Sequence, residues 1–164
     1  MGVFGDWQPQ YAEAGLVTFP VDITHKKRAV GGWQAAGRKA SADWAATKFA
    51  DANALGIVCG KRNRLTVLDI DEPCENLLAD AMARFGLSPL IARTASGKFH
   101  AYYRHNGEKR KIRGVIESRG VDLLGAGGMA IAWVSGLSAC PYLCALQLSS
   151  RACDKTLSPL HFQP

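Results

Sequence analysis

The chain has 164 residues, of which 48% are hydrophobic and 21% are charged, and its formal net charge is +6. This length suits one domain with a buried core, and the composition excludes an intrinsically disordered chain. The positive charge favours an anionic partner such as a nucleotide or a nucleic acid. The five cysteines are odd in number and irregularly spaced, which argues against a disulfide-linked secreted protein, so we expect a cytoplasmic one.

The first half of the chain mixes helical and extended patterns. We expect a helix at 7–14, a strand at 16–21, a basic loop at 25–39, a helix at 41–52 capped by Ser41, and strands at 55–59 and 65–71. Apolar residues then repeat at helical spacing from 72 to 85, and Gly86 marks the end of this helix.

The second half of the chain is dominated by strands. Short apolar runs separated by Gly, Asn or Ser predict strands at 90–94, 98–104, 112–117, 121–124 and 129–134. The pattern indicates an α+β domain with a largely antiparallel sheet. No charged residue occurs from 123 to 150, but Gly, Ser and Pro interrupt this run, so we expect no membrane span and instead an atypical tail at 135–164.

Two acids follow one another on the strand "LTVLDID". Side chains alternate along a strand, so Asp69 and Asp71 share a face with Val67. Two carboxylates about 7 Å apart would repel each other, and a hard cation such as Mg²⁺ or Mn²⁺ removes this penalty. Alternatively, Asp71 caps a helix that begins at Glu72. The strand alone does not decide between these interpretations.

The segment "TASGKFHAYYRH" supplies a second group of candidates. Its alternation puts Lys98, His100 and Arg104 on one strand face, where they could contact a phosphate. Ser96 and Gly97 form a flexible turn whose backbone N–H groups could approach an anion. A single histidine on a strand is more often a packed residue than a catalytic one, so His100 indicates a functional site only if other polar or charged residues lie close to it.

Basic residues gather after this strand. From residue 98 to residue 119 there are seven Lys and Arg against two Glu, a net charge of +5. Four of them follow the Asn106-Gly107 turn and are candidates for nucleic-acid binding: Lys109, Arg110, Lys111 and Arg113. The alternative is a solvated hairpin tip.

A third acid, Asp122, lies in another apolar strand just before the glycine-rich turn "GAGG". Three acids on neighbouring strands, a histidine and a basic groove are what two-metal nucleotidyl transfer needs. An exposed acid beside a hairpin turn would be the simpler interpretation of Asp122.

The motifs together resemble the bifunctional primase–polymerase (prim-pol) domain of the archaeo-eukaryotic primase superfamily. The resemblance lies in "LTVLDID", "SGKFH" and "VDLLGAGG", preceded by "HKKRAVGGW" and "NALGIVCG". It implies metal binding by Asp69, Asp71 and Asp122, and contact of His100 with the phosphates of a nucleotide. It also implies an RRM-like catalytic sheet packed beside an N-terminal α/β unit, within residues 1–134. The tail at 135–164 departs from the family because it lacks the Pro-Pro-Ser loop.

These features lead us to expect a template-dependent DNA primase/polymerase that uses Mg²⁺ or Mn²⁺, with DNA and nucleoside triphosphates as substrates and a replicative helicase acting in trans. One alternative is a non-catalytic nucleic-acid-binding module on the same fold. A second is a rolling-circle nuclease, but its metal site needs a His-x-His pair, and Lys98 occupies the first of these two positions.

Overall fold

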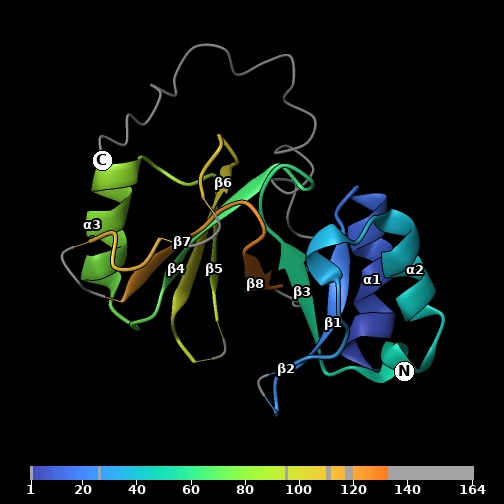
Figure 1. Ribbon diagram of the computed structural model, residues 1–164. Coiled ribbons are helices and arrows are strands. Elements are labelled where there is room, and N and C mark those ends of the chain that lie inside the picture. The colour runs from blue at the N-terminus through green and yellow to red at the C-terminus, as the bar shows by residue number, and fades with distance from the viewer. Residues whose placement is uncertain (1, 26, 95, 110–111, 117–119, 133–164) are drawn as a thin grey trace.

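In the computed structural model of the chain, two four-stranded antiparallel sheets lie side by side (Figure 1). The structure describes residues 2–25, 27–94, 96–109, 112–116 and 120–132. Its elements in chain order are α1 (Val3–Glu13), β1 (Thr18–Asp22), β2 (Lys27–Arg28), the 3₁₀ turn η1 (Trp33–Ala35), α2 (Arg38–Ala45), the 3₁₀ turn η2 (Lys48–Asp51), β3 (Ala54–Val58), β4 (Leu65–Ile70), α3 (Glu75–Phe85), β5 (Leu90–Arg93), β6 (Phe99–Arg104), β7 (Val121–Leu124) and β8 (Met129–Ile131). The predicted α+β class is confirmed.

The first sheet, in the order β2-β1-β3-β8, belongs to the N-terminal half, except that β8 joins it from the far end of the described chain. Helix α1 covers it through Phe4 and Tyr11, which are buried against Leu55 and Ile57 of β3. The predicted cap at Ser41 is wrong. Ser41 lies inside α2, where it is buried and accepts a hydrogen bond from Gln8, and the predicted helix at 41–52 is divided into α2 and η2.

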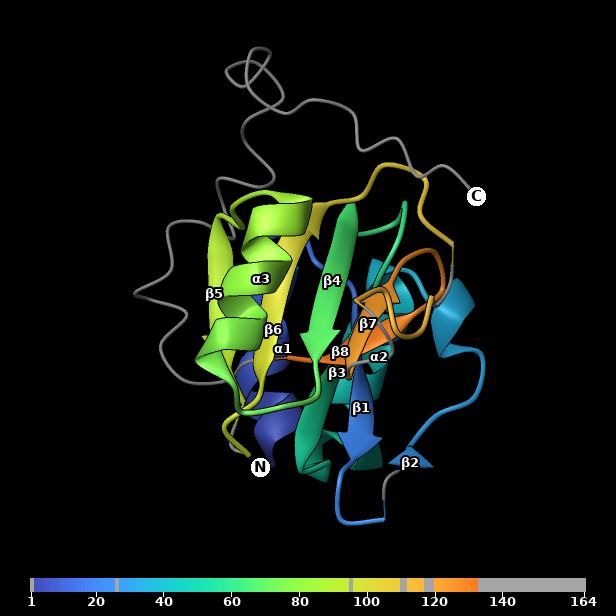
Figure 2. The same cartoon turned by 90° about the vertical axis from the view of Figure 1, so that its left-hand side faces the viewer.

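The second sheet has the order β5-β6-β4-β7, and α3 packs across one face of it (Figure 2). If the four strands are numbered 1 to 4 in chain order (β4, β5, β6, β7), they lie in the sheet in the order 4-1-3-2, which is the arrangement of an RRM-like sheet. Leu68 and Ile70 face α3, whereas Val67 packs in the core shared with the first sheet. Strand β4 is therefore buried on both faces, which explains why its sequence is almost continuously aliphatic.

Helix α3 begins later than expected. Its N-cap is Cys74, with no side-chain capping bond, and Gly86 ends it with a φ of +85°. The interpretation of Asp71 as the helix cap is therefore wrong. Asp71 directly follows β4, and residues 71–74 form an irregular connection to the helix.

The predicted strand at 112–117 is reduced, within the described residues, to a single bridge between Ile112 and Leu123. In the same segment Ile116 is fully buried, so this stretch packs on the sheet without pairing as a strand. The tail predicted at 135–164 lies outside the described residues. Among those that are described, no helix is long and apolar enough to span a membrane.

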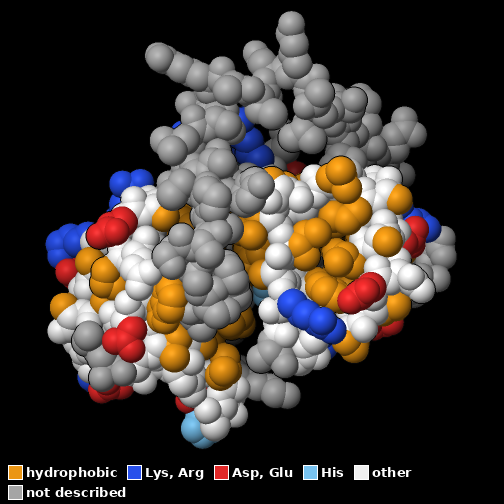
Figure 3. Space-filling view, turned by 180° about the vertical axis from the view of Figure 1, so that it is seen from behind, with side chains coloured by type: hydrophobic (Ala, Val, Ile, Leu, Met, Phe, Trp, Pro, Cys, Tyr) orange, Lys and Arg blue, Asp and Glu red, His pale blue; other side chains and the backbone are white. Residues whose placement is uncertain are grey.

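Strand β5 forms one edge of the second sheet. Seen from behind, the half of the molecule that contains β5 and α3 shows hydrophobic side chains gathered on its surface (Figure 3). Leu87 and Ile91 are among the exposed large hydrophobic residues. The opposite edge is β7, which the segment around Ile112 partly covers.

Candidate active site

One row of residues crosses all four strands of the second sheet. His100 is the partner of Ala92 on β5 and of Asp69 on β4, and Asp69 is also the partner of Asp122 on β7. Directly opposed residues of antiparallel strands project on the same face of a sheet. We call Ala92, His100, Asp69 and Asp122 the central row. It brings two of the three predicted acids and the predicted histidine side by side.

The central row lies where the apolar core ends. The row before it consists of Leu90, Tyr102, Val67 and Leu124, which belong to the core between the two sheets. The face that is apolar at one end of β4 therefore becomes acidic at the other. This change explains why a buried strand ends in two acids: its first part fills the core, and its last part opens onto a polar site.

A further row follows at the end of the sheet. The N–H of Thr94 donates to the carbonyl of Lys98 (2.8 Å), and the N–H of Asp71 donates to that of Gly120 (2.6 Å). These bonds extend the strand pairing by one residue beyond the ends of the strands. We call the four residues paired in this way the end row: Thr94, Lys98, Asp71 and Gly120. Asp71 thus lies two residues beyond Asp69 on the same face of the sheet, as the alternation predicted.

The polar groups of the two rows are paired with one another. His100, only 8% exposed, lies with its Nε2 atom 3.3 Å from Oδ1 of Asp69. The Nζ atom of Lys98 lies 3.1 Å from Oδ1 of Asp71. Asp122 accepts a hydrogen bond from the backbone N–H of Gly114 (3.3 Å). Each of these acids therefore has a neutralising or donating partner.

The donor chemistry of the two rows fits a hard divalent cation. Asp69 and Asp122 are directly opposed like charges, an arrangement that destabilises a sheet unless a cation lies between them. Within the described part of the chain, however, no three His, Cys, Asp or Glu side chains are gathered closely enough to hold a metal ion as they stand. Asp71, the third predicted ligand, is turned to Lys98 instead.

We call residues 108–116, which follow the Asn106-Gly107 turn, the basic segment, and its described part runs beside β7, an edge strand of the second sheet. Ile112 bridges to Leu123 of β7, and Gly114 donates to Asp122, so this segment approaches the central row from the β7 side. Lys109 and Arg113 are exposed. The other two predicted binding residues, Arg110 and Lys111, lie outside the described residues.

The sequence matches the family described as bifunctional DNA primase/polymerase, N-terminal, over residues 8–149. The chain belongs to this prim-pol family. The match contains every predicted site residue, and it confirms the resemblance drawn from the motifs. A comparison with curated proteins finds no match. Members of the family are primase/polymerase-type nucleotidyltransferases that act on DNA and nucleotides and generally use divalent metal ions.

The predicted nucleotide-binding residues of this prim-pol chain are divided between two places. Ser96, Gly97, Lys98 and His100 lie around the central and end rows. Gly97 has a φ of +83°, and its N–H already donates to the carbonyl of Thr94 (2.9 Å), so this donor is used within the turn. Arg104 is the partner of Leu65 at the far end of β6. Four residues of an extended strand, about 13 Å, separate it from His100.

On the other face of the prim-pol sheet, a cluster that no sequence pattern indicated holds the start of the basic segment. The carboxylate of Glu108 accepts a hydrogen bond from the hydroxyl of Thr66 (2.7 Å) and one from the N–H of Asn106 (2.9 Å). The Nδ1 atom of His105 lies 2.9 Å from the same oxygen, and its Nε2 atom is buried with no hydrogen-bond partner among the residues that the structure describes. His105 and Glu108 are three residues apart in the sequence, but only the fold brings Thr66 to them.

This cluster predicts a specific loss of stability in acid. Burial raises the pKa of Glu108, but the bonds from Asn106 and Thr66 and the nearby His105 outweigh it, so the pKa lies below its ordinary value of 4.5. A lowered carboxyl pKa stabilises the fold above the unfolded-state value, and this contribution disappears as the pH falls through the folded-state value. We expect Glu108→Gln to lose less stability than the wild type between about pH 5 and pH 3.

The measurement is the urea midpoint of unfolding at both pH values. Glu13→Gln, a change at an exposed position on α1, is the matched control and should behave as the wild type does. An equal acid loss in the wild type and in Glu108→Gln would contradict the assignment of this dependence to Glu108.

Proposed function

We propose that this chain is a template-dependent DNA primase/polymerase whose catalytic centre is formed by the central and end rows. The observation that carries the proposal is the direct cross-strand pairing of Asp69 with Asp122, with His100 on the other side of Asp69. Like charges are not placed opposite each other in a sheet for stability alone. Family membership supplies the class of reaction, and this pair supplies a location for it.

The proposed roles follow from the chemistry of each side chain. Asp69, Asp122 and Asp71 would hold Mg²⁺ or Mn²⁺, which when bound would activate the primer hydroxyl and stabilise the charge on the triphosphate. His100, close to the carboxylate of Asp69, would donate to a phosphate oxygen of the incoming nucleotide. Lys98 and Ser96, at the exposed end of the same face, would bind its outer phosphates.

The basic segment is proposed to carry the template. Lys109 and Arg113 are exposed and adjoin β7, so a strand held there would pass beside Asp122. Phosphate contacts of this kind give affinity without sequence preference. We also propose that a separate replicative helicase opens the duplex and that the protein is cytoplasmic.

Neutralising the four residues Lys109, Arg110, Lys111 and Arg113 to Gln is expected to weaken binding of single-stranded DNA. The slope of log K against log salt should fall by about 0.7 for each lost phosphate contact, because fewer counterions are released. Titrations at several salt concentrations measure this slope. The matched control neutralises Lys39 and Lys48, two exposed cations of the N-terminal half. An unchanged slope in the fourfold variant would mean that the segment is only solvated.

The rival function is a non-catalytic nucleic-acid-binding module on the same fold. Incorporation of labelled nucleotides on a single-stranded template, with Mg²⁺ or Mn²⁺ and with a chelator, separates the two. The proposal predicts incorporation that depends on the cation. Template binding without any incorporation under either cation would favour the binding module.

A further inference from the structure

We propose that Lys98 is an exchangeable counter-ion for Asp71: it neutralises this acid in the protein without nucleotide, and its move onto a triphosphate releases Asp71 toward Asp122. The inference rests on the proposed function and adds a coupling between nucleotide and cation. Lys98 would then be a positioning residue for the third acid as well as a phosphate contact.

The backbone fixes the two residues opposite each other. Ile70 is paired with Phe99, and the next positions along the two strands are Asp71 and Lys98. The turn before β6 is held close to the segment after β4, since a Cβ atom on Gly97 would lie 3.3 Å from the Cβ of Pro73. The ion pair between Lys98 and Asp71 therefore follows from the register, and exchange requires movement of side chains only.

The exposure of the pair suits it for exchange. The side chains of Lys98 and Asp71 are 38% and 46% exposed, whereas those of His100 and Asp69 are 10% and 24% exposed. An ion pair in contact with water contributes little to stability, because water screens the attraction and two long side chains must be ordered. A triphosphate carries several negative charges, so it competes with one carboxylate for the lysine.

The end row also leaves room for the released acid. On the β7 side of Asp71 stands Gly120, where an added Cβ atom would lie only 3.1 Å from the Cβ of Asp71. Gly120 immediately precedes β7 and lies two residues before Asp122, so the two positions share a face of the sheet. A rotation of Asp71 away from β6 therefore turns its carboxylate toward the side of the sheet that carries Asp122. In its present rotamer, Asp71 contributes to no three-residue metal cluster among the described residues.

The test is the affinity of the nucleotide-free full chain for Mn²⁺, measured by the loss of the free-ion electron paramagnetic resonance signal. Removing the counter-ion with Lys98→Met is expected to tighten Mn²⁺ binding on the order of fivefold, the equivalent of one exposed ion pair. Lys98→Arg, which keeps the charge, should bind Mn²⁺ as the wild type does. In an Asp71→Asn background, Lys98→Met should give no gain, because the two residues act as one unit.

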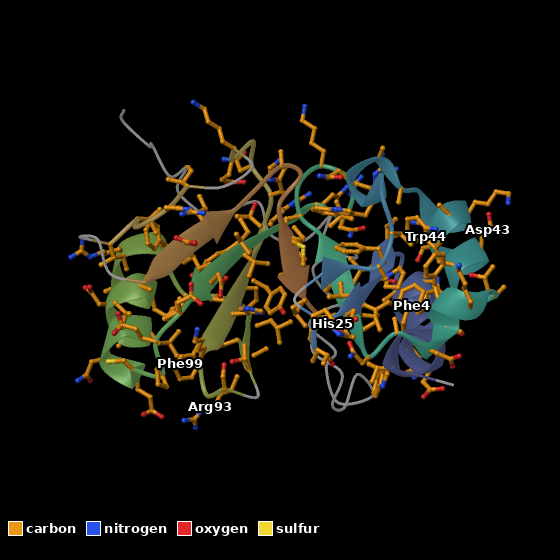
Figure 4. All side chains as sticks on the ribbon, turned by 60° about the horizontal axis from the view of Figure 1, so that its bottom comes forward. Phe4, His25, Asp43, Trp44, Arg93 and Phe99 are labelled. Atoms are coloured by element: carbon orange, nitrogen blue, oxygen red, sulfur yellow. The ribbon has the colours of Figure 1, made fainter. Side chains whose placement is uncertain are left out.

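The matched control for charge is Arg93→Met. Arg93 lies at the same end of the sheet but over the ring of Phe99, 5.6 Å from its centroid, on the α3 face (Figure 4). An equal gain in Lys98→Met and Arg93→Met would overturn the counter-ion role, as would a gain that persists in Asp71→Asn. Mn²⁺ binding that Asp69→Asn abolishes but Lys98→Met leaves unchanged would overturn this inference alone. Absence of Mn²⁺ binding in every variant would overturn both it and the proposed function.

Discussion

Asp69→Asn is expected to lower cation-dependent nucleotide incorporation by about a hundredfold or more, while the protein stays folded with an unchanged or slightly higher melting temperature. The amide keeps the shape of the side chain and can still contact His100. It removes one of two opposed negative charges, which relieves repulsion in the metal-free protein, and it removes an anionic ligand. Activity and stability should therefore move independently.

The matched control is Asp80→Asn on α3. Asp80 is partly exposed, forms a surface ion pair with Arg84 and belongs to neither the central row nor the end row, so the variant should keep wild-type incorporation. Both variants are assayed for incorporation and for melting temperature in the same buffer. Full activity in Asp69→Asn would contradict the proposed centre, and a loss of activity that follows a loss of folding would leave the charge argument without support.

Gly125→Ala is expected to lower the free energy of unfolding by about 2–3 kcal/mol, a melting-temperature decrease of roughly 5–10 °C. A Cβ atom at this position would overlap the backbone carbonyl groups of Glu108 and Lys109, which cannot move as a flexible side chain does. The carbonyl of Glu108 also accepts the N–H of Ala126, so the basic segment and the glycine-rich turn after β7 would be pushed apart together.

The same variant should also weaken binding of single-stranded DNA, because Lys109 lies in the displaced segment. Gly31→Ala is the matched control: no atom of the described residues lies within 4 Å of its added Cβ, and its φ is not positive. Differential scanning calorimetry of the two variants measures the difference. Equal melting temperatures would show that residues 106–109 do not pack closely on the glycine-rich turn.

The three polar residues of the central row, Asp69, His100 and Asp122, could be found from the sequence because each lies on an apolar strand. Alternation along one strand put Asp69 and Asp71 on a common face, and the same pattern selected His100 and Asp122. The register between strands could not be read in this way. Only the fold shows that Asp69 is opposite both His100 and Asp122. Asp71 lies two residues further along the chain and pairs with Lys98.

The errors have local physical causes. Ser41 has the chemistry of a helix cap, but its hydroxyl is used in the core by Gln8 and lies close to Thr18, so tertiary packing overrides the local preference. Helix α3 starts at Glu75 rather than at 72 because Asp71 continues the β4 ladder through its bond to Gly120. The strand expected at 112–117 has the right composition, but among the described residues only Ile112 forms a β-bridge with β7, and Val115 adds a single N–H bond to the carbonyl of Val121.

The contacts that join segments distant in the chain could not be predicted from the sequence. Thr66 is an ordinary β-branched strand residue, and nothing in its neighbourhood indicates a bond to Glu108, 42 residues later. The close approach of Gly125 to the backbone at 108 and 109 is likewise invisible, because glycine after a strand equally predicts a simple turn. Such contacts depend on the path of the chain between strands, which local patterns do not determine.

The central claim is that Asp69 and its cross-strand neighbours exist to hold a divalent cation, and the melting temperature of the wild type and of Asp69→Asn with and without Mn²⁺ tests it most directly. A cation that binds only the folded chain, at about 100 times its dissociation constant, stabilises it by about 2.7 kcal/mol, or roughly 5–10 °C for a chain of this size. We predict this increase for the wild type and none for Asp69→Asn. A wild-type melting temperature that Mn²⁺ leaves unchanged, with and without nucleotide, would contradict the account.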